Sequence, residues 1–156
     1  MDAVLADPQF HEPFSIELAV RPNDLDSLGH VNNAVVLEYL EAARWAWLAR
    51  HNLPRVGSII PIVARIEIDY RLEILPPKVV VTTILENASE ASGSVAHRYQ
   101  CIFRQLVIRS GADESRSAVE ARVQVAFVDA NERRLRSLEE YLLQPRDVRD
   151  DSAGPS

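Results

Sequence analysis

The sequence predicts an α+β domain in which a curled antiparallel sheet of about five strands wraps around one long central helix. Two observations lead to this class. Residues 34–51 carry apolar side chains at helical spacing, whereas the segments before and after them alternate with the period of two that is typical of half-buried strands. Because the later strands follow one another without a second long helix, a single helix has to cover the sheet.

The first strand and the helix follow from this change of period. Apolar residues alternate from Phe14 to Val20, and Pro22 ends the strand. The helix is expected from Ala34 to His51. Its apolar stripe contains Val35, Val36, Tyr39, Leu40, Ala43, Ala46 and Trp47. The opposite side is expected to carry Glu38, Glu41, Arg44 and Leu48.

Four side chains of the helix have further expected contacts. Trp47 is expected to point into the stripe and Trp45 away from it, so Trp45 is either an oligomer contact or an isolated exposed aromatic residue. Glu41 and Arg44 are three residues apart and are expected to pair across one turn, a contribution of roughly 0.2–0.5 kcal/mol if exposed.

Four strands connected by hairpins are expected after the helix. The first is long, because residues from Ile60 to Ile74 alternate between an apolar and a charged face until Pro76 and Pro77 end the pattern. The others are expected at Val79 to Glu86, at Val95 to Arg109 after a turn at Ser92, and at Ala118 to Val128 after the segment Ser110 to Asp113. A short helix from Leu138 to Leu143 closes the domain.

Composition indicates one compact domain, residues 1–145, followed by a disordered tail, residues 146–156. The net charge, 17 − 23 = −6, argues against nucleic acid as a partner, since phosphate binding relies on clustered lysine and arginine. The single cysteine, Cys101, is expected to be a small core residue. Neither a signal-peptide pattern nor a membrane-spanning apolar run is present, so we expect a cytoplasmic protein with no membrane partner.

Polar residues gather immediately before the helix. Asp24 and Asp26 are followed by Asn32 and Asn33, both of which are good capping residues. The first turn of a helix leaves N–H groups without partners and carries about half a positive charge, so this end can stabilise a negatively charged oxygen. The alternative is structural: these residues only cap the helix and shape an Asx-type turn around Gly29, which is the commoner role on spacing alone.

The run from Asp24 to Asn33, Asp-x-Asp-x-x-Gly-His-Val-Asn-Asn, followed by Glu-Ala-Ala-Arg at 41–44, resembles the signature of hotdog-fold thioesterases of the 4-hydroxybenzoyl-CoA thioesterase type. Residues 37–45 are particularly similar to the bacterial long-chain acyl-CoA thioesterases of this group. The strand pattern extends the resemblance from about Phe14 to Leu143. It implies the hotdog fold and hydrolysis of a fatty or aromatic acyl-CoA to the free acid and CoA.

The resemblance also implies the site residues. Asp26 would be the catalytic carboxylate, as a general base for water or as the nucleophile, and the amide near Asn33 would polarise the thioester carbonyl. His30 either holds the loop or donates a hydrogen bond in the active site. Candidate substrate-binding residues are Asn32, Asp24, which positions the loop or His30, Val36 in the acyl pocket, and Arg65, Arg71 and Lys78, which either meet the CoA phosphates or are ordinary exposed charges.

Two positions depart from the family pattern. Val36 stands where the family usually has tyrosine, which implies a differently shaped acyl pocket. Pro76-Pro77-Lys78 replaces the common Gly-Asp turn. No cofactor or metal is expected, because the histidines are scattered and only one cysteine exists. A serine hydrolase is disfavoured because the chain has no Gly-x-Ser-x-Gly motif.

Two other functions share this fold. A hotdog hydratase or dehydratase would need a histidine paired with an acid on the helix, which offers no histidine before His51. A non-catalytic acyl-CoA-binding protein would use Asp26 only as a cap. Whichever of these functions holds, an uncovered edge strand of the sheet favours association with a second copy of the chain. The family implies a homodimer or homotetramer with each active site at a subunit interface.

Overall fold

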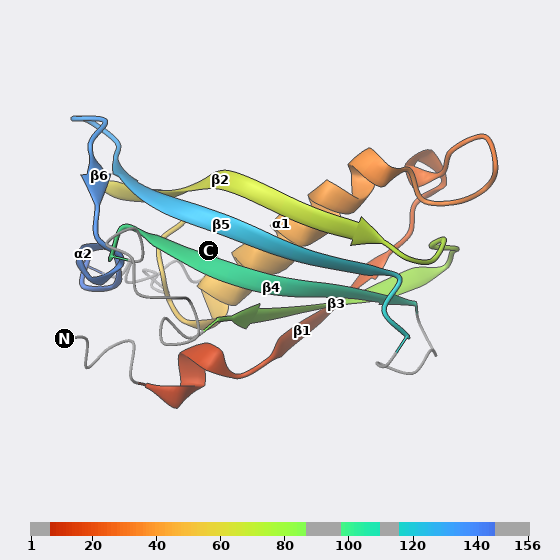
Figure 1. Ribbon diagram of the computed structural model, residues 1–156, viewed down its shortest axis with the longest axis horizontal. Coiled ribbons are helices and arrows are strands. Elements are labelled where there is room, and N and C mark those ends of the chain that lie inside the picture. The colour runs from red at the N-terminus through yellow and green to blue at the C-terminus, as the bar shows by residue number, and fades with distance from the viewer. Residues whose placement is uncertain (1–6, 87–97, 110–115, 146–156) are drawn as a thin grey trace, which may run out of the picture.

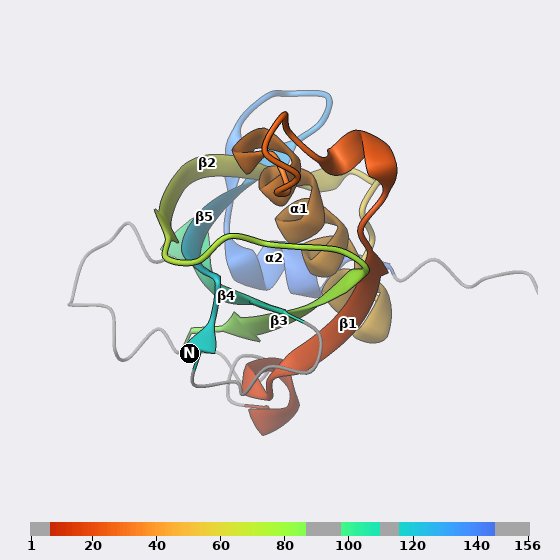
Figure 2. The same cartoon turned by 90° about the vertical axis from the view of Figure 1, so that its right-hand side faces the viewer.

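One long helix, α1 (Asn33–Arg50), lies in the concave side of a curled antiparallel sheet (Figures 1 and 2). The computed structural model describes residues 7–86, 98–109 and 116–145. The strands are β1 (Phe14–Ala19), β2 (Ile59–Tyr70), β3 (Lys78–Leu85), β4 (Gln100–Arg109), β5 (Val119–Asp129) and β6 (Leu135–Arg136). The shorter helices are η1 (Pro8–His11), η2 (Pro22–Asp24) and α2 (Leu138–Leu142). The predicted α+β class is confirmed.

The strand order is β1-β3-β4-β5-β2, every neighbouring pair is antiparallel, and β6 pairs with β5 outside this path. The predicted hairpin between β2 and β3 is wrong. β2 pairs with β5 at one edge, and the chain then crosses to β3 near the other edge (Figure 2). This crossing, residues 71–77, passes the start of α1, where the Val31 N–H donates to the Ile74 carbonyl oxygen at 2.9 Å. Periodicity identifies strands but not their partners.

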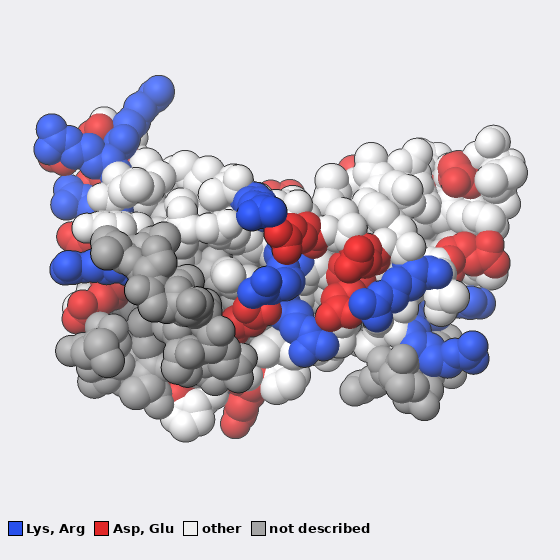
Figure 3. All heavy atoms as spheres, in the orientation of Figure 1, with Lys and Arg blue, Asp and Glu red and all other residues white. Residues whose placement is uncertain are grey.

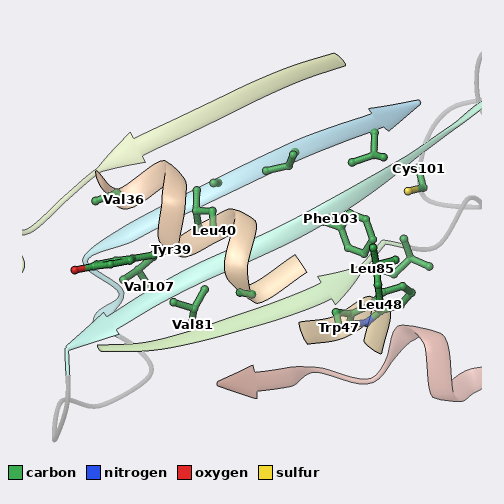
Figure 4. Packing of buried hydrophobic residues seen from close by; sticks show 14 of the residues in the cluster. Val36, Tyr39, Leu40, Trp47, Leu48, Val81, Leu85, Cys101, Phe103 and Val107 are labelled. Carbon is green, nitrogen blue, oxygen red and sulfur yellow. The ribbon is translucent and has the colours of Figure 1, made fainter. Parts of the chain in front are cut away.

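The hydrophobic core fills the space between α1 and the concave face of the sheet (Figure 4). Cross-strand partners share a face, so the inward residues of β3, β4 and β5 form continuous rows beneath the helix. Trp47 packs edge-on against Phe103, with ring centroids 5.0 Å apart. Cys101 is a buried core residue, as predicted, and burial raises the pKa of its thiol.

The helix begins one residue earlier than predicted and ends at Arg50. The Asn32 side chain caps it by accepting a hydrogen bond from the Ala34 N–H at 2.8 Å. Trp45 is 37% exposed and lies beneath the guanidinium of Arg55, 3.5 Å from the ring centroid. This outward orientation of Trp45 was predicted.

The predicted outward orientation of Arg44 and Leu48 is wrong, since both are buried. Arg44 donates from Nη1 to Oε1 of Gln105 on β4, at 2.9 Å, in place of the predicted pairing with Glu41. The concave sheet reaches far enough around α1 to bury these two side chains, which a helical wheel assigns to the polar side.

Strand β2 changes faces along its length. Its register against β5 shifts between Val63 and Arg65, so Ala64 forms a bulge. The residues of β2 that face α1 are Pro61, Val63, Ile66, Ile68 and Tyr70. The prediction of one continuous apolar face from Ile60 to Ile74 is therefore wrong, because alternation alone does not reveal an inserted residue.

Several strand boundaries also differ. β2 ends at Tyr70, because the N–H groups of Arg71 and Leu72 both donate to the Ala118 carbonyl oxygen and the chain then leaves the sheet. β4 begins at Gln100, and the turns predicted at 92 and 110–113 lie outside the described residues, as does the tail 146–156. The two-residue strand β6 was not predicted. No helix in the described part of the chain is long and apolar enough to cross a membrane.

The packing predicts that two Leu→Ala variants differ strongly in their free energy of unfolding. Leu40 has no exposed surface, whereas Leu143 is 64% exposed. Leu40→Ala should lower the free energy of unfolding by about 2–5 kcal/mol through lost burial and a cavity. Leu143→Ala, the matched control, should change it by less than about 0.5 kcal/mol. Urea denaturation measures both, and equal losses would contradict the arrangement of the core.

Candidate active site

The loop before α1 is closed by the carboxylate of Asp26. Its Oδ1 accepts hydrogen bonds from the N–H groups of Leu28, at 2.9 Å, and His30, at 3.1 Å. Its own N–H donates to the His30 carbonyl oxygen at 2.7 Å, and Gly29 takes a φ of +79°. The predicted turn around Gly29 is thus confirmed. The other carboxylate oxygen, Oδ2, accepts no hydrogen bond from any residue that the structure describes.

Asp24 is buried beneath this loop. Its Oδ2 accepts hydrogen bonds from the Tyr39 hydroxyl, at 2.6 Å, and from the Arg21 N–H, at 2.8 Å. Arg21 Nη2 lies 2.9 Å from Oδ1. Burial alone would raise the pKa of Asp24, but the hydrogen bonds from Arg21 and Tyr39 outweigh it and hold the pKa below its usual value. Asp24 therefore carries a buried negative charge that ties the loop to the middle of α1.

The first N–H groups of α1 have different partners. Val35 and Val36 donate to the Asn32 carbonyl oxygen. The Asn33 N–H donates to no atom of the described residues and is one of the unpaired donors expected at a helix start. The Asn33 carbonyl oxygen accepts a hydrogen bond from the Tyr70 hydroxyl at 2.9 Å. This bond fixes the start of α1 against the end of β2.

Asp26 and Asn33 line one cleft with a volume of about 270 Å³. The cleft lies between the loop, the first turn of α1, the end of β2 and the crossing residues 71–74. It brings together five of the residues predicted from the sequence: Asp26, His30, Asn33, Val36 and Arg71. Asp26 is exposed in the single chain, but its carboxylate is held at this cleft by the loop.

His30 contacts both Asp26 and the crossing segment. Its backbone N–H and carbonyl oxygen hold Asp26 on both sides. Its ring Nε2 lies 2.8 Å from Oε2 of Glu73, which belongs to the crossing segment. Arg71, which also lines the cleft, pairs with Glu120 at 2.7 Å. The loop and the crossing segment are therefore joined by side chains as well as by the backbone.

The remaining candidates lie elsewhere. Asp24 and Asn32 support the loop and the helix start from behind the cleft. Arg65 pairs with Glu67 at 2.6 Å, and Lys78 with Glu17 at 2.8 Å, both on the convex face of the sheet. Figure 3 shows acidic and basic side chains side by side over this face. Strand pairing, which the sequence does not reveal, separates these two cations from the cleft.

Two cleft residues were not singled out from the sequence. Tyr70 was predicted to lie on the inward face of β2, but its hydroxyl contact with the helix start required the tertiary fold. Glu73 was predicted as an exposed strand residue and instead pairs with His30 in the crossing segment. Neither contact has a local signal in the sequence, because both depend on how the end of β2 and the crossing segment lie against the loop and the start of α1.

The geometry suits chemistry at a carbonyl group. An unpaired N–H at the positive end of a helix can stabilise charge on the carbonyl oxygen, and a carboxylate with one free oxygen can act on the carbon or on a water. Among the described residues, no group of three or more His, Cys, Asp or Glu side chains is placed to hold a metal ion.

Comparisons with known proteins identify a family and similar sequences and structures. The family model of the thioesterase-like superfamily matches residues 20–145. The long-chain acyl-CoA thioesterase FadM of Escherichia coli (strain K12) is 34% identical, over 49% of this chain and 61% of FadM. The match thus spans less than two thirds of the length of FadM.

Two solved structures are similar in fold. A thioesterase from Thermus thermophilus, in complex with coenzyme A and Zn, is 30% identical with a TM-score of 0.62, covering 82% of this chain and 92% of that one. The PA2801 protein from Pseudomonas aeruginosa is 24% identical with a TM-score of 0.68, covering 83% and 92%. The predicted hotdog fold is confirmed.

The buried carboxylate of Asp24 predicts a pH-dependent contribution to stability. Because its pKa is lowered in the folded state, the contribution is present above the ordinary aspartate pKa and is lost as the pH falls through the folded value. Asp24→Asn should therefore lower the free energy of unfolding by about 1–3 kcal/mol at pH 7. The difference from wild type should shrink below about pH 4. Urea denaturation at several pH values tests this, and a difference that grows on acidification would contradict it.

Proposed function

Because the chain belongs to the thioesterase-like superfamily, we propose that it hydrolyses the thioester of an acyl-CoA to the free acid and CoA. One observation carries the proposal: Asp26 and Asn33, whose N–H has no partner among the described residues, line the same cleft. FadM supports a fatty acyl group, since its name gives long-chain acyl-CoA as its substrate. The Thermus thermophilus thioesterase, solved with coenzyme A, supports CoA as the thiol.

The oxyanion would form at the start of α1. Attack on the thioester carbon moves charge onto the carbonyl oxygen, and the Asn33 N–H is the donor left available for it. The aligned peptide dipoles of α1 add to the same stabilisation. The Tyr70 hydroxyl holds the adjacent Asn33–Ala34 peptide through the Asn33 carbonyl oxygen, so the start of α1 is fixed before the substrate binds.

Asp26 would supply the second half of the chemistry. Two backbone N–H groups hold its Oδ1, which leaves Oδ2 to accept a proton from water or to attack the carbonyl carbon itself. On the first route the water that loses a proton to Asp26 adds to the carbonyl carbon, the C–S bond breaks, and the CoA thiolate takes that proton from Asp26. On the second route Asp26 forms an anhydride as the C–S bond breaks, the CoA thiolate takes a proton from water, and water then hydrolyses the anhydride to the acid and the Asp26 carboxylate. Arg71 is the cation at the cleft that would meet a CoA phosphate.

A homodimer or homotetramer would complete the site. β2 is an edge strand of twelve residues whose inward apolar side chains remain partly exposed. Its end also forms one wall of the cleft. A partner pairing along this edge would cover the strand and enclose Asp26, which is exposed in the single chain.

Activity should depend on Asp26 but not on a similar aspartate elsewhere. Asp26→Asn should reduce CoA release from fatty acyl-CoA by about 100- to 10,000-fold. Asp129→Asn is the control, because Asp129 likewise accepts two loop N–H groups, from Asn131 at 2.9 Å and Glu132 at 2.8 Å, but outside the cleft. A thiol-release assay over short, medium, long and aromatic acyl-CoAs measures both. Wild type without activity on the whole panel, or an active Asp26→Asn, rules out the proposal.

The assembly makes a separate prediction. Light scattering should give a mass of twice or four times the 17.5 kDa of one chain. If the partner completes the site, specific activity should fall on dilution as this mass falls towards that of one chain. A fully active species with the mass of one chain would exclude an active site that needs two subunits.

A further inference from the structure

A second cavity, of about 320 Å³, lies between α1 and the β5–β2 half of the sheet. Its volume falls within the roughly 300–1,000 Å³ of small-molecule sites. The walls are apolar and include Leu48, Phe103, Val125, Phe127, Leu138 and Leu142. Figure 4 shows Leu48 and Phe103 close together at this end of the core, with Val36 at the other end of the helix.

This cavity is separate from the proposed active site. Asn33 and Val36 line the cleft, whereas Arg44 and Leu48 line the cavity. At 1.5 Å per residue, the eleven steps from Asn33 to Arg44 span about 16 Å of helix. The two spaces share no lining residue among those that the structure describes.

A buried guanidinium forms one wall of the cavity. Arg44 is only 7% exposed, and Nη1 donates to Oε1 of Gln105 at 2.9 Å. The amide nitrogen of Gln105 donates hydrogen bonds to the Leu40 carbonyl oxygen and to Thr83 Oγ1, both at 2.9 Å. Gln105 is neutral, so this network positions the guanidinium without balancing its charge.

The charge of Arg44 has no close counterion. No carboxylate of the described residues lies within 4.0 Å of the guanidinium. Burial lowers the pKa of Arg44, and the exposed Glu41 at the rim opposes this shift only from a distance. An unbalanced charge in an apolar site is costly unless a ligand or solvent compensates it.

Two guanidinium nitrogens of Arg44 have no acceptor on the described residues. Nε and Nη2 donate to none of them, neither atom is fully enclosed, and Arg44 lines the cavity. Trp47 also lines the cavity, but its indole Nε1 is fully buried, without a hydrogen-bond partner among the described residues, and does not reach the open space. The cavity therefore combines apolar walls with guanidinium donors that lack an acceptor on the described residues.

We propose that this cavity binds a free medium-chain fatty acid, with its carboxylate on Arg44 and its chain between α1, β5 and α2. The order of residues along β5 sets the direction of the fatty-acid chain. Gln105, which accepts the hydrogen bond from Arg44, pairs with Ala121 of β5. Ala121 lies between Val119, which lines the cleft, and Val125, which lines the cavity. Arg44 therefore lies at the end of the cavity nearer the cleft, and the apolar walls continue away from the cleft.

The volume favours a small ligand. A cavity of about 320 Å³ lies at the lower end of the roughly 300–1,000 Å³ of small-molecule sites, which suits a chain of medium length. Decanoate, with ten carbons and two oxygens, matches this size. The site goes beyond the proposed hydrolysis, because binding of the free acid involves no thioester.

Calorimetric titration of the full chain with decanoate tests the proposal. Decanoate should bind at least about tenfold more tightly than decanol, which lacks the charge. Arg44→Met should weaken decanoate binding by about 10- to 100-fold, and Arg44→Lys should restore part of it. Arg104→Met is the matched control: Arg104 pairs with Glu120 on the convex face next to Gln105, so its loss should leave binding unchanged.

Two variants separate this site from the catalytic one. Val63→Phe, at a half-exposed cavity position, keeps Arg44 and should block decanoate by filling the space. Asp26→Asn should bind decanoate as wild type does, whether or not hydrolysis is lost. Equal binding of decanol, full binding by Arg44→Met, or loss of binding in Asp26→Asn would each overturn the proposal. An enzyme inactive on every acyl-CoA would refute only the proposed hydrolysis.

Discussion

The structure depends on one constraint: a single helix fills the concave side of a sheet that is wider than the helix. α1 packs chiefly on β1, β3 and β4. Towards β2 the helix leaves two spaces, the cleft at the start of α1 and the cavity beside its second half, each lined in part by residues of β5 and β2. The same constraint leaves β2 as an edge strand with partly exposed apolar residues. The candidate sites and the unpaired edge have one physical origin.

The loop before α1 assigns different tasks to two neighbouring carboxylates. Asp24 is buried, charged and fully hydrogen-bonded, so it fixes the loop to the helix through Tyr39. Asp26 points to the exposed side, where backbone N–H groups hold one oxygen and leave the other available. A rigid support next to a partly free carboxylate is the arrangement that positioned catalysis requires. The crossing segment completes it through Glu73 and Ile74.

The polar network inside the core has a different character. Gln105 has no exposed surface and joins β4 to β3 and α1 through three hydrogen bonds. Such a network adds specificity to the packing, but it also holds the Arg44 guanidinium in a place that burial disfavours. A charge kept at this cost at the wall of an apolar cavity is more simply explained by a ligand than by packing alone. This is the physical reason for the fatty-acid site.

The sequence by itself determined most of the elements and the geometry of the loop before α1. The change from period two to helical period located β1 and α1 within one or two residues, and the spacing of Asp26, Gly29 and Asn32 identified the turn and the cap, because these interactions are local. Only the tertiary structure decided that β2 pairs with β5, that a bulge reverses its face, and that Arg44 turns inward. These features depend on contacts between residues distant in the chain, whose energies no local pattern records.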